Sequence, residues 1–261
     1  MIPREFQEYE LNSSTGQMEQ FLRHDSGPGP DRLLIFTTQN NLRLLETSDH
    51  WFADGTFSIS PPLFTQLYTI HAEYLNQVHP ALYALLPSKS STTYDRLLRE
   101  VQNLTPAANP KSILTDFELA AINSFRRNFA GAEIKGCFFH LFQSVWRRIQ
   151  SLGLQQEYSQ NSNFALSARM IFVPVQQMDD YFIDLSNYLD PSLQPILDYF
   201  EDNYLGRIQR RGTTRRTPMF EPQVWNVFLR TLLREPTTPL KHGTEECQPH
   251  LQCNIQLFGN L

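Results

Sequence analysis

The sequence has few cysteines, no long hydrophobic run and no excess of positive charge. Its 261 residues include 3 cysteines, which cannot build a framework of several disulfides, so we expect a reducing compartment. No apolar stretch reaches the length of a membrane span and the first residues lack signal-peptide character, so we expect no membrane partner. The net charge of -5 excludes a whole-surface nucleic-acid binder but allows a local basic patch.

What is present suits a folded domain. Hydrophobic residues make up 41% of the chain and aromatic residues 12%, enough to bury a sizeable core. The length allows one large domain, or one domain that carries an insertion.

Two kinds of apolar spacing follow one another in the first part of the chain. Strand-like runs come first, at residues 33–37, 51–59, 63–72 and 79–86. From residue 91 the spacing is helical, with short buried runs between the helices: helices at 91–104, 117–129 and 139–152, strands at 112–115 and 134–138. The order predicts an α/β fold with a mixed sheet flanked by helices, in which three strands form an antiparallel meander.

The next segment has a different character. Residues 154–206 show helix-like spacing and little strand signal, with candidate helices at 164–171, 178–189 and 193–204. We therefore expect an all-α insertion. Residues 1–30 are polar and end in a loop signature rich in glycine and proline.

Two aspartates end up near one another in this arrangement. Asp54 lies within the strand that begins at Trp51, and Asp116 lies at the carboxyl end of the strand 112–115. Neighbouring strands would bring both carboxylates to one edge, where they could bind a pair of divalent cations. The ordinary alternatives are that Asp-Gly forms a turn and that an aspartate after a strand caps the next helix.

Five short blocks occur in one order and carry a resemblance. They are Phe52-Ala-Asp-Gly-Thr-Phe, Leu67-Tyr-Thr-Ile-His, Ala84-Leu-Leu-Pro-Ser-Lys, Leu114-Thr-Asp-Phe-Glu and Lys135-Gly-Cys-Phe-Phe-His. The ordered set resembles the transposase domain of Mutator-like elements (MULE) over roughly residues 30 to 230, although each block alone is weak. The resemblance implies a ribonuclease-H-like fold of the DDE superfamily, a site for Mg²⁺ or Mn²⁺ at Asp54 and Asp116, and DNA (transposon ends and target) as substrate. It also implies a homo-oligomer and a location in the nucleus, with the cytoplasm as the alternative.

Other polar residues in the blocks have less certain roles. Cys137 and His140 correspond to the family's Cys-x-x-His pair, for which we expect a supporting structural role, with assistance to catalysis as the lesser option. A zinc site is disfavoured because two ligands are not four. Glu118 is a tempting third acid, but it begins a helix, and interaction with the helix N-terminus explains it. Lys89 is by default a solvated lysine.

Five arginines fall within ten residues: Arg207, Arg210, Arg211, Arg215 and Arg216. The functional interpretation is contact with DNA phosphates, and the alternative is a solvated surface loop.

The third acid of the family is missing. After Pro218-Met-Phe and Trp225-Asn-Val the family has Arg-Thr-Asn-Asn-x-x-Glu-Gly/Ala-Trp-His, whereas this chain reads Arg234-Glu-Pro-Thr-Thr-Pro-Leu-Lys-His-Gly-Thr. Codons for the written residues, read in a shifted frame, can encode Arg-Thr-Asn-Asn-Ser-Ile-Glu-Ala-Trp-His-Arg. We therefore expect a frameshifted tail, an incomplete two-metal site and an inactive copy that is also truncated at its start.

The expected organisation follows from these points. It comprises a polar segment (1–30), a catalytic core (31–153), a helical insertion (154–217), a return to the core (218–233) and the aberrant tail (234–261). Two other functions stay open. One is a domesticated, non-catalytic DNA- or chromatin-binding protein derived from a transposase, and the other is a different ribonuclease-H-like nuclease. The latter is disfavoured because such sites usually keep further acids near the first strand.

Overall fold

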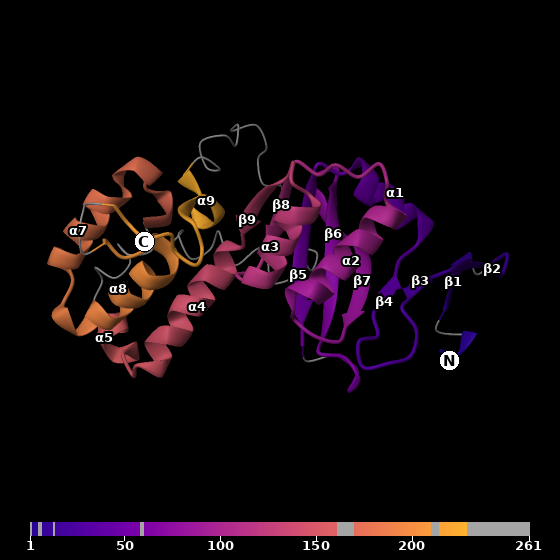
Figure 1. Ribbon diagram of the computed structural model, residues 1–261, viewed down its shortest axis with the longest axis horizontal. Helices are drawn as coiled ribbons and strands as arrows, with labels where there is room; N and C mark the ends of the chain where they lie inside the picture. Colours follow the sequence, from indigo (N-terminus) through magenta and orange to yellow (C-terminus); the bar gives the residue numbers. More distant parts are fainter. Residues whose placement is uncertain are drawn as a thin grey trace. The chain divides into compact units, whose positions relative to one another are not determined.

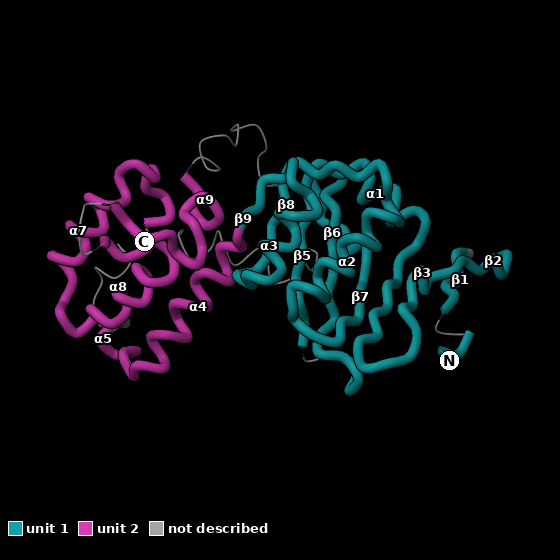
Figure 2. The backbone as a smooth tube through the Cα atoms, viewed as in Figure 1, with its two compact units in different colours: residues 1–135 teal, residues 136–261 magenta. Residues whose placement is uncertain are grey.

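The computed structural model describes residues 2–4, 7–12, 14–57, 60–160, 170–209 and 214–228. The chain forms two compact units, residues 1–135 and 136–261 (Figure 2). This division is coarser than the five segments expected from the sequence, which stay a prediction. Among the described residues, no helix combines the length and the apolar character needed to cross a membrane.

A seven-stranded mixed sheet organises the first unit, in the order β3-β4-β7-β6-β5-β8-β9 (Figure 1). Its strands are β3 (Leu22–Asp25), β4 (Leu34–Phe36), β5 (His50–Thr56), β6 (Gln66–Tyr74), β7 (Gln77–Leu86), β8 (Ser112–Thr115) and β9 (Glu133–Gly136). Strands β5, β6 and β7 form the predicted antiparallel meander, and β5 pairs with β8 in parallel. The sheet and its helices are compatible with a ribonuclease-H-like fold, as the sequence predicted.

Three helices cover one face of the sheet: α1 (Gln39–Thr47), α2 (Ser91–Leu104) and α3 (Leu119–Asn128) (Figure 1). Trp51 of β5 is fully buried on this face; its indole N–H donates to the carbonyl of Leu45, and its ring meets that of Phe129 at 5.0 Å. The ring of Tyr94 in α2 meets that of Tyr68 in β6 at 5.2 Å. These aromatic contacts join the helices to the strands that carry the candidate site.

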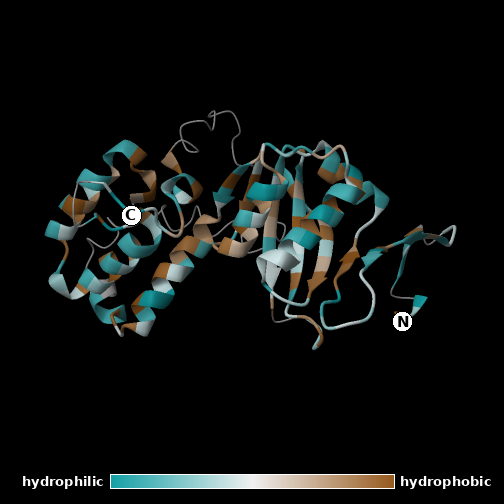
Figure 3. Cartoon of the chain, viewed as in Figure 1, coloured by the Kyte–Doolittle hydropathy of each residue, from teal (hydrophilic) through white to brown (hydrophobic). Residues whose placement is uncertain are grey.

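The other face of the sheet is less buried. Side chains alternate between the two faces of a strand, and Phe52, His71, Leu85 and Leu114 are only half-buried, whereas the neighbouring residues on the helical face are buried. Asp54 follows the phase of Phe52 and belongs to this second face. Figure 3 shows that hydrophobic and hydrophilic residues are mixed along the strands.

Most elements of the first unit were predicted, and the differences are local. Helix α2 is capped by Ser90, whose hydroxyl accepts from the Thr93 N–H. The hairpin turn between β6 and β7 is Leu75-Asn76, and both residues have positive φ. This conformation matches the twist of a tight antiparallel hairpin.

The polar N-terminal segment contains strands that the sequence did not reveal. Strands β1 (Glu8–Asn12) and β2 (Gln17–Gln20) form a separate two-stranded sheet, and β3 pairs with β4 at the edge of the main sheet. These strands are short, charged and largely exposed, so they lack the apolar alternation that identifies the central strands.

The second unit is helical over most of its described residues. Its elements are α4 (Phe138–Ser151), α5 (Gln155–Gln160), η3 (Met170–Phe172), η4 (Val175–Gln177), α7 (Met178–Tyr188), η5 (Pro191–Leu193), α8 (Gln194–Phe200), the π-helix η6 (Glu201–Leu205) and α9 (Pro222–Trp225). The helices predicted at 178–189 and 193–204 are found as α7 and as α8 with η6. The helix predicted at 164–171 begins outside the described residues.

The Trp-Asn block after the helices is a packing anchor. The Trp225 indole N–H donates to the carbonyls of Tyr204 and Phe220, both at 3.1 Å, and the Phe220 ring stacks on Tyr204. The Asn226 amide donates to the Val173 carbonyl at 2.8 Å. These bonds join α9 to the helices before it. In α4, Leu141 and Ile149 are buried, whereas Trp146 is 39% exposed.

Candidate functional site

The two candidate aspartates lie on neighbouring parallel strands, as predicted. Strand β5 pairs with β8 up to Ala53 opposite Thr115, so Asp54 and Asp116 are the next positions on each strand. This register places the two residues at the same level of the sheet, on strands that lie about 4.8 Å apart. The Thr115 hydroxyl donates to Asp116 Oδ1 at 3.3 Å. The catalytic roles of both aspartates stay a prediction.

His71 lies beside Asp54 on the less buried face. His71 pairs with Phe52 across β5 and β6, and Asp54 pairs with Thr69, so His71 is a diagonal neighbour of Asp54 on the same face. Burial lowers the pKa of His71 below its ordinary value, although the Phe52 backbone and the charge of Asp54 both act to raise it. The imidazole next to Asp54 therefore favours its neutral form.

A chain of buried hydrogen bonds runs along the helical face towards Asp116. The Gln66 side-chain amide donates to the Tyr94 hydroxyl at 2.7 Å, and this hydroxyl donates to Glu118 Oε1 at 2.8 Å. Lys89 Nζ lies 3.2 Å from Glu118 Oε2. Gln66 and Tyr94 are at most 1% exposed, so the chain is shielded from water.

Glu118 does not behave as the sequence suggested. It occupies the N-cap position of α3, but its side chain makes no cap hydrogen bond. Its carboxylate is instead bound by Tyr94 and Lys89. Burial raises the pKa of Tyr94, and the nearby charges of Glu118 and Asp116 add to this effect. The tyrosine therefore keeps its proton and serves as a donor to the carboxylate.

Gly55, between Asp54 and Thr56, leaves room for this network. A Cβ at Gly55 would lie 2.5 Å from Gln66 Oε1 and 3.5 Å from Tyr68 Cδ2. Gln66 thus passes directly over the backbone of the aspartate strand. The Asp-Gly pair is not a turn here, because both residues lie inside β5.

The described residues supply only part of a metal site. Within them, no group of three or more His, Cys, Asp and Glu side chains is arranged to hold a metal ion. Mg²⁺ is commonly held by one or two carboxylates with water completing its octahedron. Binding of Mg²⁺ or Mn²⁺ by Asp54 and Asp116 stays a prediction.

Cys137 and His140 lie together at the beginning of α4, in the second unit. Cys137 is the N-cap residue and His140 lies three residues further, on the first turn. Burial acts to raise the pKa of the Cys137 thiol, but hydrogen bonds from the His140 side chain and backbone outweigh it, so the pKa lies below its ordinary value. This contact is local to the helix start and fits the supporting structural role that we expected, which stays a prediction.

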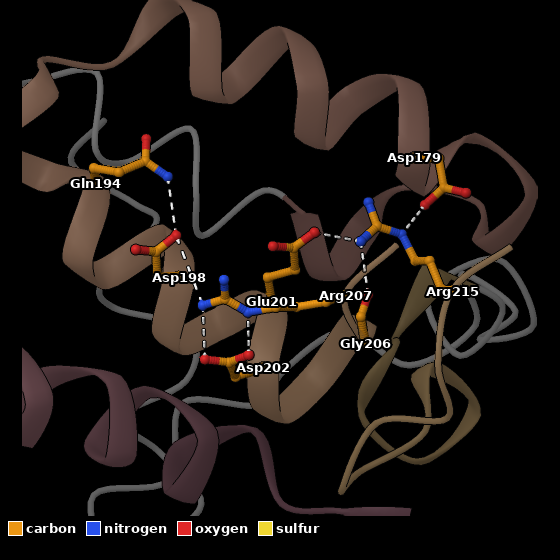
Figure 4. A network of polar contacts seen from close by, with 8 residues as sticks. All are labelled: Asp179, Gln194, Asp198, Glu201, Asp202, Gly206, Arg207 and Arg215. Atoms are coloured by element: carbon orange, nitrogen blue, oxygen red, sulfur yellow. Dashed lines mark hydrogen bonds and ion pairs between the residues drawn. The ribbon is translucent and has the colours of Figure 1, made fainter. Parts of the chain in front are cut away.

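The five arginines divide into different environments. Arg215 is buried in the second unit: it contacts Asp179, donates to Glu201 Oε1 at 2.7 Å and donates to the Gly206 carbonyl at 2.7 Å (Figure 4). Arg207 contacts Asp202 through two hydrogen bonds and lies 4.0 Å from Asp198. Both cations are thus engaged within the protein.

Arg216 is the exposed member of the set among the described residues. Its backbone N–H donates to the Arg207 carbonyl at 2.9 Å, and Ile208 pairs with Arg215, so residues 207–209 and 214–216 form an antiparallel pair. Arg210 and Arg211 lie outside the described residues, as does the tail 234–261. Contact of these arginines with DNA stays a prediction.

Sequence reasoning missed several residues of the site. Tyr94 was read as an apolar position of a helix and Gln66 was not considered, because nothing in a local pattern reveals a hydrogen bond between residues far apart in sequence. His71 was part of a recognised block, but its place beside Asp54 needs the strand register. The polar residues within apolar runs were the signal that could have identified them.

The fold and the two aspartates define a class of protein: a mixed α/β domain with two acids at adjacent parallel strands. Residues 50–144 match the family model of the MULE transposase domain, which confirms the resemblance for this part of the chain. The matched segment contains β5 to β9 and both aspartates. No curated protein matches the chain. The match supports a transposase-related function.

Proposed function

We propose that this chain carries the core of a DNA transposase that performs metal-dependent phosphodiester cleavage and strand transfer in complete relatives. The observation that carries the proposal is the register of β5 and β8, which sets Asp54 and Asp116 side by side within the matched segment. Carboxylates so placed suit a hard divalent cation that contacts DNA phosphates.

Asp54 and Asp116 would hold Mg²⁺ or Mn²⁺, and the bound ion would polarise a phosphate oxygen and favour ionisation of an attacking hydroxyl. The residues of the chain contribute position. Gln66 packs over Gly55 and fixes the strand of Asp54, while the Thr115 hydroxyl orients Asp116. Without a third carboxylate we expect cleavage to be very weak, because positioning of the reacting groups supplies much of the rate.

A second candidate is a domesticated, non-catalytic DNA- or chromatin-binding protein. The sequence lacks the family's third acid at the expected place, which favours this alternative over an active enzyme. In that case the fold and the basic residues would bind DNA or chromatin, and the aspartates would be dispensable. The nucleus is the proposed location for either function, and a homo-oligomer is the proposed assembly.

An assay of DNA cleavage and strand transfer with Mg²⁺ and Mn²⁺ separates these outcomes. We expect the chain to bind DNA but to cleave it at most marginally. Robust cleavage that is lost in Asp54→Ala would show that another residue supplies the third acid. Equal DNA affinity of wild type, Asp54→Asn and Asp116→Asn, with and without the cation, would favour the non-catalytic alternative.

A further inference from the structure

Lys89 connects the ends of the two strands that carry the aspartates. Its ammonium lies 3.2 Å from Glu118 Oε2, two residues after Asp116, and 3.8 Å from the ring centroid of Phe57, three residues after Asp54. The Lys89 side chain is 43% exposed and Phe57 is 47% exposed, so both are accessible at the edge of the site.

The site itself repels DNA. Asp54 lies in β5, Asp116 directly follows the adjacent strand β8, and Glu118 lies two residues further at the start of α3. A phosphate that approaches these carboxylates without a cation meets negative charge. Lys89 is a cation in direct contact with Glu118 of this acidic group. A half-exposed ion pair contributes little to stability, so Lys89 can leave Glu118 for a phosphate at small cost.

Glu118 is a fixed partner for this lysine. Its carboxylate is 17% exposed and is held by Tyr94, whose hydroxyl is in turn held by Gln66. The buried hydrogen bonds prevent Glu118 from following Lys89 outward. The Phe57 ring supports the ammonium from another side through a cation–π contact.

We propose that Lys89 binds a DNA backbone phosphate at the edge of the Asp54–Asp116 site, and that Glu118 holds Lys89 in place until DNA arrives. The inference rests on the proposed DNA-binding function and adds a particular contact to it. An exposed cation over an aromatic ring, next to carboxylates that would hold a metal, suits a nucleic-acid backbone.

The test measures the affinity of the whole chain for a short DNA duplex over a range of salt concentrations, in the absence of divalent cations. Loss of one phosphate contact should reduce the slope of log K against log salt by about 0.9 for duplex DNA. We expect Lys89→Gln to show this change with a several-fold loss of affinity, and Lys89→Arg to restore both. Glu118→Gln should bind more tightly than wild type, because the competing carboxylate is gone.

Lys111 supplies a matched control, since it is also paired with an acid, Asp49, at 2.7 Å, but it precedes β8 at the end opposite Asp116. Lys111→Gln should leave the slope unchanged. Lys89→Gln with the affinity and slope of wild type, or an equal change in Lys111→Gln, would overturn the proposal while DNA binding by the chain stands. A wild-type chain that does not bind DNA would overturn the proposed function as well. Melting temperatures confirm that each variant is folded.

Discussion

At two glycines, Gly206 and Gly55, a segment distant in the sequence approaches the backbone closely. Gly206 ends the π-helix η6 with a φ of 81°, and a Cβ there would lie 1.8 Å from the Arg216 carbonyl oxygen. Gly55 is constrained by Gln66 in the first unit. A sequence shows only that these residues are glycines; the close approach of a distant segment is a property of the fold.

We predict that Gly206→Ala destabilises the second unit by about 2–4 kcal/mol, because it combines left-handed backbone strain with a clash against backbone. Gly153→Ala is the matched control: φ is 70°, but nothing lies within 4 Å of the added Cβ. It should cost only about 1 kcal/mol. Chemical denaturation measures both, and equal losses would contradict the steric argument.

The second prediction at this scale concerns pH and His71. Its folded pKa is lowered, chiefly by burial, so between the unfolded value near 6.5 and the folded value the unfolded chain binds more protons. This contribution to stability is therefore present above pH 6.5 and is lost as the pH falls towards the folded pKa. We expect the stability difference between wild type and His71→Asn to shrink from pH 7.5 to 5.5 in thermal melts. A difference that grows over this range would contradict the assignment.

At the scale of elements, apolar periodicity predicted the central sheet and its helices well, because those elements bury one face. It failed where burial is not local: β1, β2 and β3 are short and polar, and Trp146 is exposed on α4. The positions of Asp54 and Asp116 on adjacent strands were predictable from the order of strands. The hydrogen-bond chain through Gln66 and Tyr94 was not, since it joins residues 28 positions apart.

In the paired segments 207–209 and 214–216, we expect Arg215 and Arg216 to have different roles. Arg215 is 12% exposed and binds Asp179, Glu201 and the Gly206 carbonyl, so Arg215→Ala should cost about 1–3 kcal/mol of stability. Arg216 is exposed, so Arg216→Ala should change stability by less than about 0.5 kcal/mol. If Arg216 contacts a phosphate, that variant alone lowers DNA affinity with an intact fold. Unfolding curves and DNA titrations on both variants provide the comparison, and a stable Arg215→Ala would contradict the anchoring role.

We predict that the tail after about residue 234 stands in place of a helix of the fold. A restored reading frame should replace it with a helix that begins near Thr-Asn-Asn, side chains that can cap it, and that brings a glutamate towards Asp54 and Asp116. Sequencing the locus checks the frame, and the restored protein should have a higher melting temperature. Nucleotides that do not encode the glutamate motif would end the frameshift hypothesis.

At the scale of the whole molecule, we propose a transposase core that keeps two of the three acids expected to bind metal. The fold class and the resemblance to the MULE transposase domain followed from the sequence, because ordered motifs report on a whole fold, and the family model confirms the resemblance over residues 50–144. The function of the acids depends on charge and geometry that only a measurement on the protein can test.

The most direct measurement is calorimetric titration of Mn²⁺ into the whole chain, compared with Asp54→Asn and Asp116→Asn. The account predicts one weak site that is lost in each variant, because both carboxylates are needed to hold the ion and no third is available to hold a second. Two tightly bound ions, or binding that is unchanged in both variants, would contradict it.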